Sequence, residues 1–301
     1  MRFNKLIGKK ILYFDGAMGT QIQNLSISIP TIPETLNITH PELITMIHKN
    51  YISAGSDIVT ANTFGANSYK LSNSSYNVKE VIHAGIKVAK DAGSNMIALD
   101  IGPIGALVGP FGDLSFDEAY NIFCEQISAG FNAGCDLILI ETMTDIYEAK
   151  AAVLAAKDSC DLPIICSMTF EENGRTLTGT DPLSMVTILE GLRVDVIGIN
   201  CSFGPDKMLP LVKEICKYSS IPVLVQPNAG LPVVKDNKTI YNTSPEQFTH
   251  YMKDIANAGA RLLGGCCGTS PEYIDNLVKE TQNITLTKIE EKKYTAVSSS
   301  T

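Results

Sequence analysis

The sequence predicts an α/β protein whose strands and helices form a (β/α)₈ TIM barrel. Eight short apolar runs alternate with helical patterns at about the spacing that βαβ units need. The runs are apolar at consecutive positions, which is typical of parallel strands covered by helices. Eight such units in a chain of 301 residues fit a closed barrel better than an open doubly wound sheet.

The first half of the chain supplies four of these units. Asp15 follows the first strand, Gly55 ends the first long helix, and Ser115 and Gly134 bracket the third helix as cap and stop. The predicted strands are 11–14, 57–64, 96–101 and 136–143, and the predicted helices are 41–54, 78–92, 115–133 and 145–156.

The second half repeats the pattern, with Pro182, Pro245 and Pro271 at helix starts. The predicted strands are 163–170, 194–201, 222–229 and a short run from Arg261 to Cys266, and the predicted helices are 182–192, 206–218, 245–258 and one beginning near Pro271. We expect the barrel to occupy residues 1–284, and residues 285–301 to form a polar tail or linker.

Composition excludes several other classes of protein. A net charge of −8 without any Lys/Arg cluster gives no support for a nucleic-acid partner. The most apolar long stretch, 96–111, contains Asp100, glycines and prolines, so we expect no membrane span, and the apolar run near the N-terminus is too short for a signal peptide. Eight cysteines without compact spacing indicate a reducing cytoplasm.

Polar residues stand at or just beyond the carboxyl ends of the predicted strands. In barrel enzymes these strand ends meet at one rim of the barrel, and the catalytic residues lie there. The rim residues are Asp15, Asn62, Asp100, Glu141, Asn200, Cys201, Gln226, Asn228, Cys266 and Cys267.

Three rim cysteines predict a metal site. Cys266 and Cys267 are adjacent and therefore poorly placed to form a disulfide with each other, because consecutive α-carbons are about 3.8 Å apart. Cys201 ends another apolar run and would lie at the same edge. Three thiolates with no histidine at any strand end indicate zinc, and three ligands leave the fourth position open, as in a catalytic site.

The remaining candidate ligands have weaker cases. His40, His48, His83 and His250 fall in or beside predicted helices, where we expect surface or capping roles. Five other cysteines are expected in helices or in the core: Cys124, Cys135, Cys160, Cys166 and Cys216.

A zinc ion with three thiolate ligands is a poor activator of water but a good holder of a thiol substrate, which metal coordination deprotonates. The inferred reaction is attack by the zinc-activated thiol on a carbon electrophile. Asp15 and Glu141 suit the ammonium of an amino-acid thiol, and backbone N–H groups near Gly16, or Thr63, suit its carboxylate. No motif indicates a phosphate loop or a serine nucleophile.

Three motifs resemble the homocysteine S-methyltransferase family: Asp15-Gly-Ala-Met-Gly-Thr20, Gly198-Ile-Asn-Cys-Ser202 and Gly264-Gly-Cys-Cys-Gly-Thr269. The likeness runs from about residue 5 to 283 and is strongest to the homocysteine-binding module of cobalamin-dependent methionine synthases, notably in Gln226-Pro-Asn-Ala-Gly-Leu-Pro232.

The resemblance implies a (β/α)₈ barrel in which Cys201, Cys266 and Cys267 bind catalytic zinc (Zn²⁺) and the sulfur of L-homocysteine takes the fourth position. Asp15 and Glu141 match positions that hold the amino-acid end of the substrate. Gly16, Thr63 and Asn200 complete the expected substrate site, and the side-chain oxygen of Asn228 is expected to reach the metal while substrate is absent.

The resemblance also implies the methyl donor. Methylcobalamin would come from a corrinoid-carrying domain or protein, with a folate-binding domain recharging it, so the chain is either a fragment of a modular enzyme or a stand-alone subunit. One alternative is a corrinoid-independent homocysteine methyltransferase that uses S-methylmethionine or a betaine. The other is a non-catalytic zinc-binding barrel, which would lose its fold on chelation and would not bind homocysteine.

Overall fold

All eight predicted strands are present in the computed structural model of the chain, and all are parallel. The structure describes residues 2–25, 27–235, 238–292 and 295–298. The strands are β1 (Leu12–Tyr13), β2 (Val59–Thr60), β3 (Ile97–Ile101), β4 (Leu137–Met143), β5 (Ile164–Met168), β6 (Val196–Asn200), β7 (Val223–Gln226) and β10 (Leu262–Leu263).

The sheet closes into a barrel. Its strand order is β1-β10-β7-β6-β5-β4-β3-β2. A parallel bridge between Phe14 and Ile58 joins the two ends of that order, supported by N–H groups of Asp57 and Ile58 that donate to the Tyr13 carbonyl oxygen at 2.8 and 3.0 Å. The predicted closed barrel is therefore confirmed.

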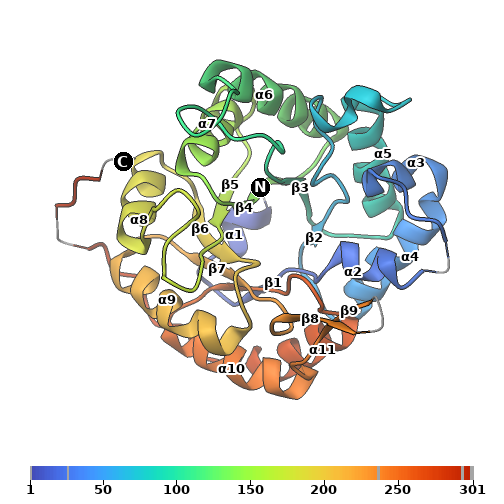
Figure 1. Ribbon diagram of the computed structural model, residues 1–301. Coiled ribbons are helices and arrows are strands. Elements are labelled where there is room, and N and C mark those ends of the chain that lie inside the picture. Colours follow the sequence, from blue (N-terminus) through green and yellow to red (C-terminus); the bar gives the residue numbers. More distant parts are fainter. Residues whose placement is uncertain (1, 26, 236–237, 293–294, 299–301) are drawn as a thin grey trace.

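A helix follows each strand, and together these helices form the outer ring in Figure 1. They are α4 (Pro41–Ser53), α5 (Val78–Asp91), α6 (Phe116–Ala133), α7 (Ile146–Ser159), α8 (Pro182–Gly191), α9 (Pro205–Tyr218), α10 (Pro245–Ala258) and α11 (Pro271–Thr281). Ser115 and Ser244 each form a capping box at the start of their helices, which satisfies backbone N–H groups that a helix start leaves unpaired.

The sequence did not predict the shorter elements. These are α1 (Arg2–Leu6), α2 (Met18–Gln23), η1 (Pro33–Thr35), α3 (Leu36–Thr39), η2 (Lys70–Asn73) and an antiparallel hairpin of β8 (Pro232–Lys235) and β9 (Lys238–Tyr241). The hairpin lies between β7 and α10 in the chain, so it belongs to the rim.

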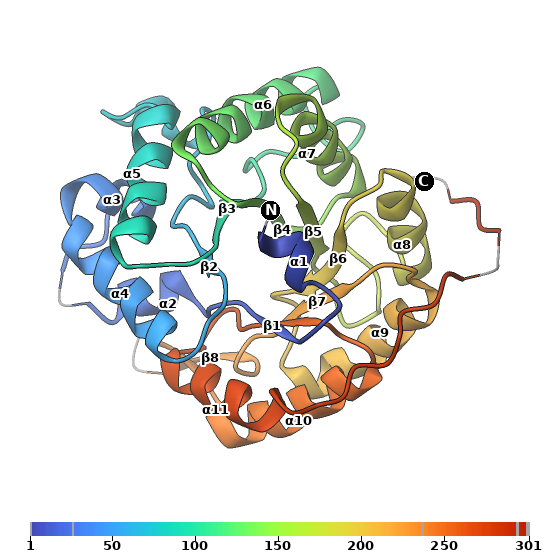
Figure 2. The same cartoon turned by 180° about the vertical axis from the view of Figure 1, so that it is seen from behind.

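The inside of the barrel is apolar at one end and polar at the other. Alternate strand residues such as Ala98, Leu139 and Leu224 point inward and form a dry cluster. Phe3 of α1 packs into the same cluster, and Figure 2 shows α1 at the centre of this face, where it plugs the amino-terminal end of the barrel. The open end is therefore the carboxyl-terminal rim.

The segment after α11 contacts the barrel. Arg261 donates to the carbonyl oxygen and the hydroxyl of Thr287 at 2.6 and 2.9 Å, and the Lys292 N–H donates to Ser220 Oγ at 3.0 Å. Ile284 and Leu286 pack against the core. A domain boundary at residue 284 remains a prediction. Within the described part of the chain, no helix has both the length and the apolar character to cross a membrane.

The predicted surface or capping role is wrong for His48. This side chain is fully buried in α4, and neither ring nitrogen has a hydrogen-bond partner. Burial lowers the pKa of His48 to about 4. The other three histidines fit the prediction better, since His40 lies at the N-cap position of α4, His83 is half-buried and His250 is exposed.

We predict that His48 makes the fold acid-sensitive. Between pH 6.5 and 4 the unfolded chain binds a proton at this position that the folded chain does not, so the free energy of unfolding falls as pH falls. His48→Leu should remove roughly 2 kcal/mol of the loss in stability between pH 7 and 4.5, measured by denaturant unfolding at both values. Gln126→Leu is the control, because Gln126 is equally buried and unpaired but does not titrate; an equal pH dependence in both variants would contradict the assignment.

Candidate functional site

A cavity of about 640 Å³ opens at the carboxyl-terminal rim. It brings together nine of the predicted rim and site residues: Asp15, Gly16, Asn62, Asp100, Glu141, Cys201, Gln226, Cys266 and Cys267. Much of the rest of its wall comes from α2, η1, the start of η2 and Tyr241 of the hairpin. The strand ends therefore converge as the sequence predicts.

The three cysteines form one cluster. Their sulfur atoms all lie within 4.8 Å of one another, and the Sγ atoms of Cys201 and Cys267 are 3.6 Å apart. Cys201 has a left-handed backbone, with φ of 51°, which breaks the in-out alternation after Asn200 at the end of β6. This unusual conformation places the Cys201 sulfur at the rim instead of among the helices.

Backbone bonds between neighbouring strands fix the cluster. The Cys266 N–H donates to the Pro227 carbonyl oxygen at 2.8 Å, and the Cys201 N–H donates to the Gln226 carbonyl oxygen at 3.2 Å. Thr269 donates through its hydroxyl to the Cys266 carbonyl oxygen at 2.7 Å. The cysteine positions thus depend on the barrel scaffold and not on flexible loops.

The donor set fits a tetrahedral zinc ion. Zn–S bonds of about 2.3 Å place two sulfurs about 3.8 Å apart, close to the observed 3.6 Å. Hydrogen bonds from the Cys201 and Cys266 thiols lower the pKa of Cys267 to about 3, so the cluster already favours a thiolate. Asn228 is buried, and the N–H of the next residue, Ala229, donates to the Cys267 carbonyl oxygen at 2.9 Å. The Asn228 Oδ1 has no hydrogen-bond partner, as expected of an oxygen that binds a further ligand.

Asp15 stands at the end of β1 and is oriented by β2. Thr60 donates to it twice, from its backbone N–H at 2.8 Å and from its hydroxyl at 2.7 Å. Burial raises the pKa of Asp15 to about 7 in spite of these bonds. Gly16 follows it because a Cβ there would lie 2.6 Å from Thr269 Oγ1.

Asn200 orients Glu141. It is fully buried, and its Nδ2 donates to Glu141 Oε2 at 2.7 Å and to the Thr142 hydroxyl at 2.8 Å. Its Oδ1 accepts from the Thr142 N–H and from the Ser167 hydroxyl, so the amide orientation is fully determined. Burial raises the pKa of Glu141 to about 7. Asn200 acts here on Glu141, and direct contact with substrate remains a prediction.

Asp100 lies on β3, and Thr63 lies in the loop that follows the neighbouring strand β2. Thr63 is fully buried, and its hydroxyl donates to the Asp100 carbonyl oxygen at 2.9 Å. The Asp100 carboxyl faces the cavity beside Glu141, and burial together with the charge of Glu141 raises the pKa of Asp100. Thr63 therefore holds the end of β3, and its predicted contact with substrate remains untested.

Two residues of the site escaped sequence reasoning. Tyr241 reaches the cavity from the unpredicted hairpin, where its hydroxyl faces the Cys267 sulfur and its ring covers Gly268. Lys70 is the one basic side chain among the described lining residues, and its Nζ donates to the Pro103 carbonyl oxygen at 2.8 Å. Two β-branched pairs around Asp236-Asn237 are a sequence signal for the hairpin, but no signal marked Lys70.

The other cysteines lie apart from the cluster. Cys135 and Cys166 are core residues, as predicted, while Cys124 and Cys216 lie in helices and Cys160 ends α7. Among the described residues, the rim cysteines are the one group of three or more His, Cys, Asp or Glu side chains with metal-binding spacing.

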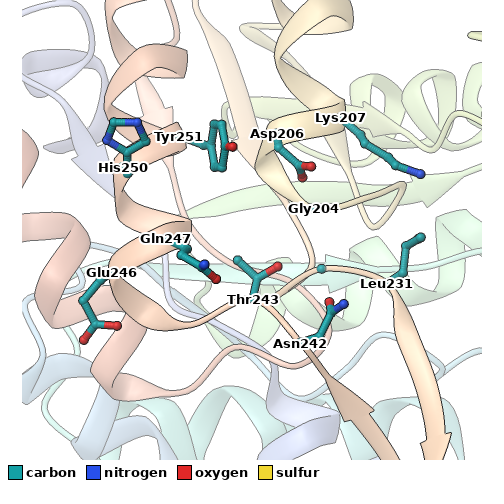
Figure 3. Close-up of a pocket in the computed structure, with 11 residues that line it drawn as sticks. Gly204, Asp206, Lys207, Leu231, Asn242, Thr243, Glu246, Gln247, His250 and Tyr251 are labelled. Carbon is teal, nitrogen blue, oxygen red and sulfur yellow. The ribbon is translucent and has the colours of Figure 1, made fainter.

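A second rim cavity of about 570 Å³ lies between the starts of α9 and α10. Figure 3 shows Asp206 and Lys207 of α9 on one side and Gln247, His250 and Tyr251 of α10 on the other. Its lining contains no cysteine and mixes acidic and basic side chains. It does not share the donor set of the first cavity.

Comparison with known proteins agrees with this geometry. Residues 12–281 match the family model described as homocysteine S-methyltransferase. The chain is 31% identical to methionine synthase of Mycobacterium tuberculosis, over 93% of this chain and 25% of that protein, and 30% identical to methionine synthase of Mycobacterium leprae, over 89% and 24%. The chain thus spans about a quarter of the length of these relatives.

Solved structures show the same fold. The oxidized form of the homocysteine methyltransferase MmuM from Escherichia coli superposes with a TM-score of 0.80 at 22% identity, covering 93% of this chain and 99% of that chain. Its metallated form gives a TM-score of 0.76 at 22% identity, covering 90% and 96%.

We predict that each rim cysteine is needed for metal binding and none for folding. Cys201→Ala, Cys266→Ala and Cys267→Ala should each lose the zinc that the unmodified protein retains through gel filtration, because each removes one of three ligands from a half-buried position. Circular dichroism should show the barrel intact. Cys166→Ala, in the core of β5, is the control and should keep its zinc; a rim variant that also keeps it would contradict the ligand set.

Proposed function

The chain belongs to the homocysteine S-methyltransferase family, and we propose that it methylates the sulfur of L-homocysteine to give methionine. The observation that carries this proposal is the cavity with three sulfurs on one wall and buried carboxyl groups beside them. A thiol amino acid complements both, through its sulfur and its ammonium.

We infer that Cys201, Cys266 and Cys267 hold zinc, with Asn228 as the fourth ligand when substrate is absent. Bound there, zinc would keep the substrate thiol deprotonated at neutral pH, where a free thiol, with a pKa of about 8.5, is mostly protonated. The 3.6 Å spacing of two sulfurs and the unpaired Asn228 oxygen support this donor set.

The carboxyl groups orient the substrate in this proposal. Asp15 and Glu141 accept hydrogen bonds from the ammonium, and its positive charge favours their ionised forms, which burial alone disfavours. Asn200 and Thr60 hold the two carboxyl groups in place. Backbone N–H groups near Gly16 are the proposed donors to the substrate carboxylate.

Methyl transfer then proceeds by nucleophilic substitution. A sulfur lone pair forms the new S–CH₃ bond while the bond between the methyl group and its carrier breaks, and that electron pair stays with the carrier. The thiol proton has left before this step. The chain aligns the sulfur with the cavity mouth, and the donor approaches from outside.

Methylcobalamin is the proposed donor, carried by a corrinoid domain or protein that a folate-binding domain recharges. The names of the mycobacterial relatives and their fourfold greater length support it. The alternative is a small donor such as S-methylmethionine or a betaine, favoured by the match to 99% of the Escherichia coli homocysteine methyltransferase chain. We place either reaction in the reducing cytoplasm, where thiols persist.

A single-turnover assay tests this function. Zinc-loaded protein is mixed with L-homocysteine and either free methylcobalamin, S-methylmethionine or glycine betaine, and methionine is quantified. If methylcobalamin is the one donor of the three that yields methionine, the result supports the proposal. Methionine formed with either small donor supports the alternative. If the protein neither forms methionine nor binds homocysteine, the non-catalytic zinc-binding barrel is the remaining interpretation.

We predict that Glu141 binds substrate and not metal. Glu141→Ala should weaken binding of L-homocysteine by about 10- to 100-fold, the range for a lost hydrogen bond to a charged group, while the zinc content is unchanged. Isothermal titration calorimetry and metal analysis give the two readouts. The matched control is Glu148→Ala, since Glu148 is also buried but accepts from the Ile104 N–H outside the cavity lining. Loss of zinc in Glu141→Ala would refute the division of roles.

A further inference from the structure

Asp100 is a carboxyl group of the cavity lining to which the proposed reaction gives no role. It is only 7% exposed, yet it lines the cavity, and its Oδ1 has no hydrogen-bond partner. An unpaired buried oxygen is costly, and in a native site it commonly marks the place of a ligand donor.

The second oxygen of Asp100 is accounted for. The carboxyl groups of Asp100 and Glu141 form a hydrogen bond with each other, which requires a proton between them. Among the residues that the structure describes, the charged groups that face Asp100 are Glu141, Asp15 and Glu34, and Lys70 is the one cation near it. Burial among three acids raises the pKa of Asp100, so this residue keeps the proton and Glu141 accepts it.

The acceptors match the donors of an α-ammonium group. Such a group offers three N–H donors, as a lysine ammonium does. Asp15 accepts from Thr60, Glu141 accepts from Asn200 and Asp100, and each of these carboxylates retains lone pairs for a further donor. With Asp100 Oδ1, these groups supply three carboxyl acceptors for the three donors. Glu34, a fourth carboxyl group among the described lining residues, already accepts from the Gly65 N–H.

We propose that Asp100, as a neutral acid, is the third acceptor of the substrate ammonium, binding it through Oδ1 while its hydroxyl donates to Glu141. Thr63 holds the residue in place, because its hydroxyl bridges the N–H and carbonyl of Asp100 at 3.1 and 2.9 Å. Asp100 then selects α-amino thiols over thiols that lack the amino group. This inference rests on the proposed function and adds a specificity determinant to it.

The test compares two thiols on the zinc-loaded protein. L-homocysteine and 4-mercaptobutyrate differ only in the amino group, so the ratio of their dissociation constants isolates the ammonium contacts. Asp100→Ala and Asp100→Leu should each reduce the preference for L-homocysteine by about 10- to 100-fold, with zinc content and 4-mercaptobutyrate affinity unchanged. Asp100→Asn should rescue the preference, since an amide donates to Glu141 and accepts at Oδ1 as the neutral acid does.

The control is Asp145→Ala. Asp145 is 1% exposed and also has an unpaired oxygen at the rim, but it caps α7 and does not line the cavity. It should leave the ratio unchanged. An unchanged ratio in Asp100→Ala or Asp100→Leu, or a loss of preference in Asp100→Asn as large as in Asp100→Ala, would overturn the inference. Failure of the unmodified protein to bind L-homocysteine would instead overturn the proposed function.

Discussion

The site depends on the parallel pairing of β6, β7 and β10. Cys201 and Cys267 are 66 residues apart in the chain, and they meet because the ends of these strands are neighbours in the barrel. Backbone bonds from the cysteines to Gln226 and Pro227 then fix the sulfur positions. The scaffold has its own apolar core below the rim, so we expect that the metal and substrate contacts can be changed without loss of the fold.

Burial of acidic groups gives the cavity its chemical character. Asp15, Asp100 and Glu141 are buried at the ends of β1, β3 and β4, and Lys70 is the one basic side chain among the described lining residues. Burial disfavours the ionised form of these carboxyl groups until a cation binds beside them. A ligand with an ammonium group therefore stabilises the site, and an anion does not. The sulfur wall beside it adds the second requirement, a thiol. These two requirements together describe homocysteine better than either does alone.

The sequence predicted the repeating units and the convergence of the three rim cysteines, because both leave local signals. Helix caps and apolar runs mark each βα unit, and the rim cysteines stand directly after apolar strands. Contacts between distant segments leave no such signal. The pairing of Asp100 with Glu141 and the approach of Tyr241 to Cys267 arise only on folding, and buried His48 contradicted a prediction made from its helical setting alone.

The most direct test of the account is a titration of zinc-loaded protein with L-homocysteine at neutral pH, followed by zinc-edge X-ray absorption and by proton release. The account predicts a zinc shell of three sulfurs and one oxygen that exchanges the oxygen for a fourth sulfur, as about one proton leaves for each homocysteine bound. A zinc shell that stays the same when homocysteine is added would contradict it, since the metal would then have a structural or storage role.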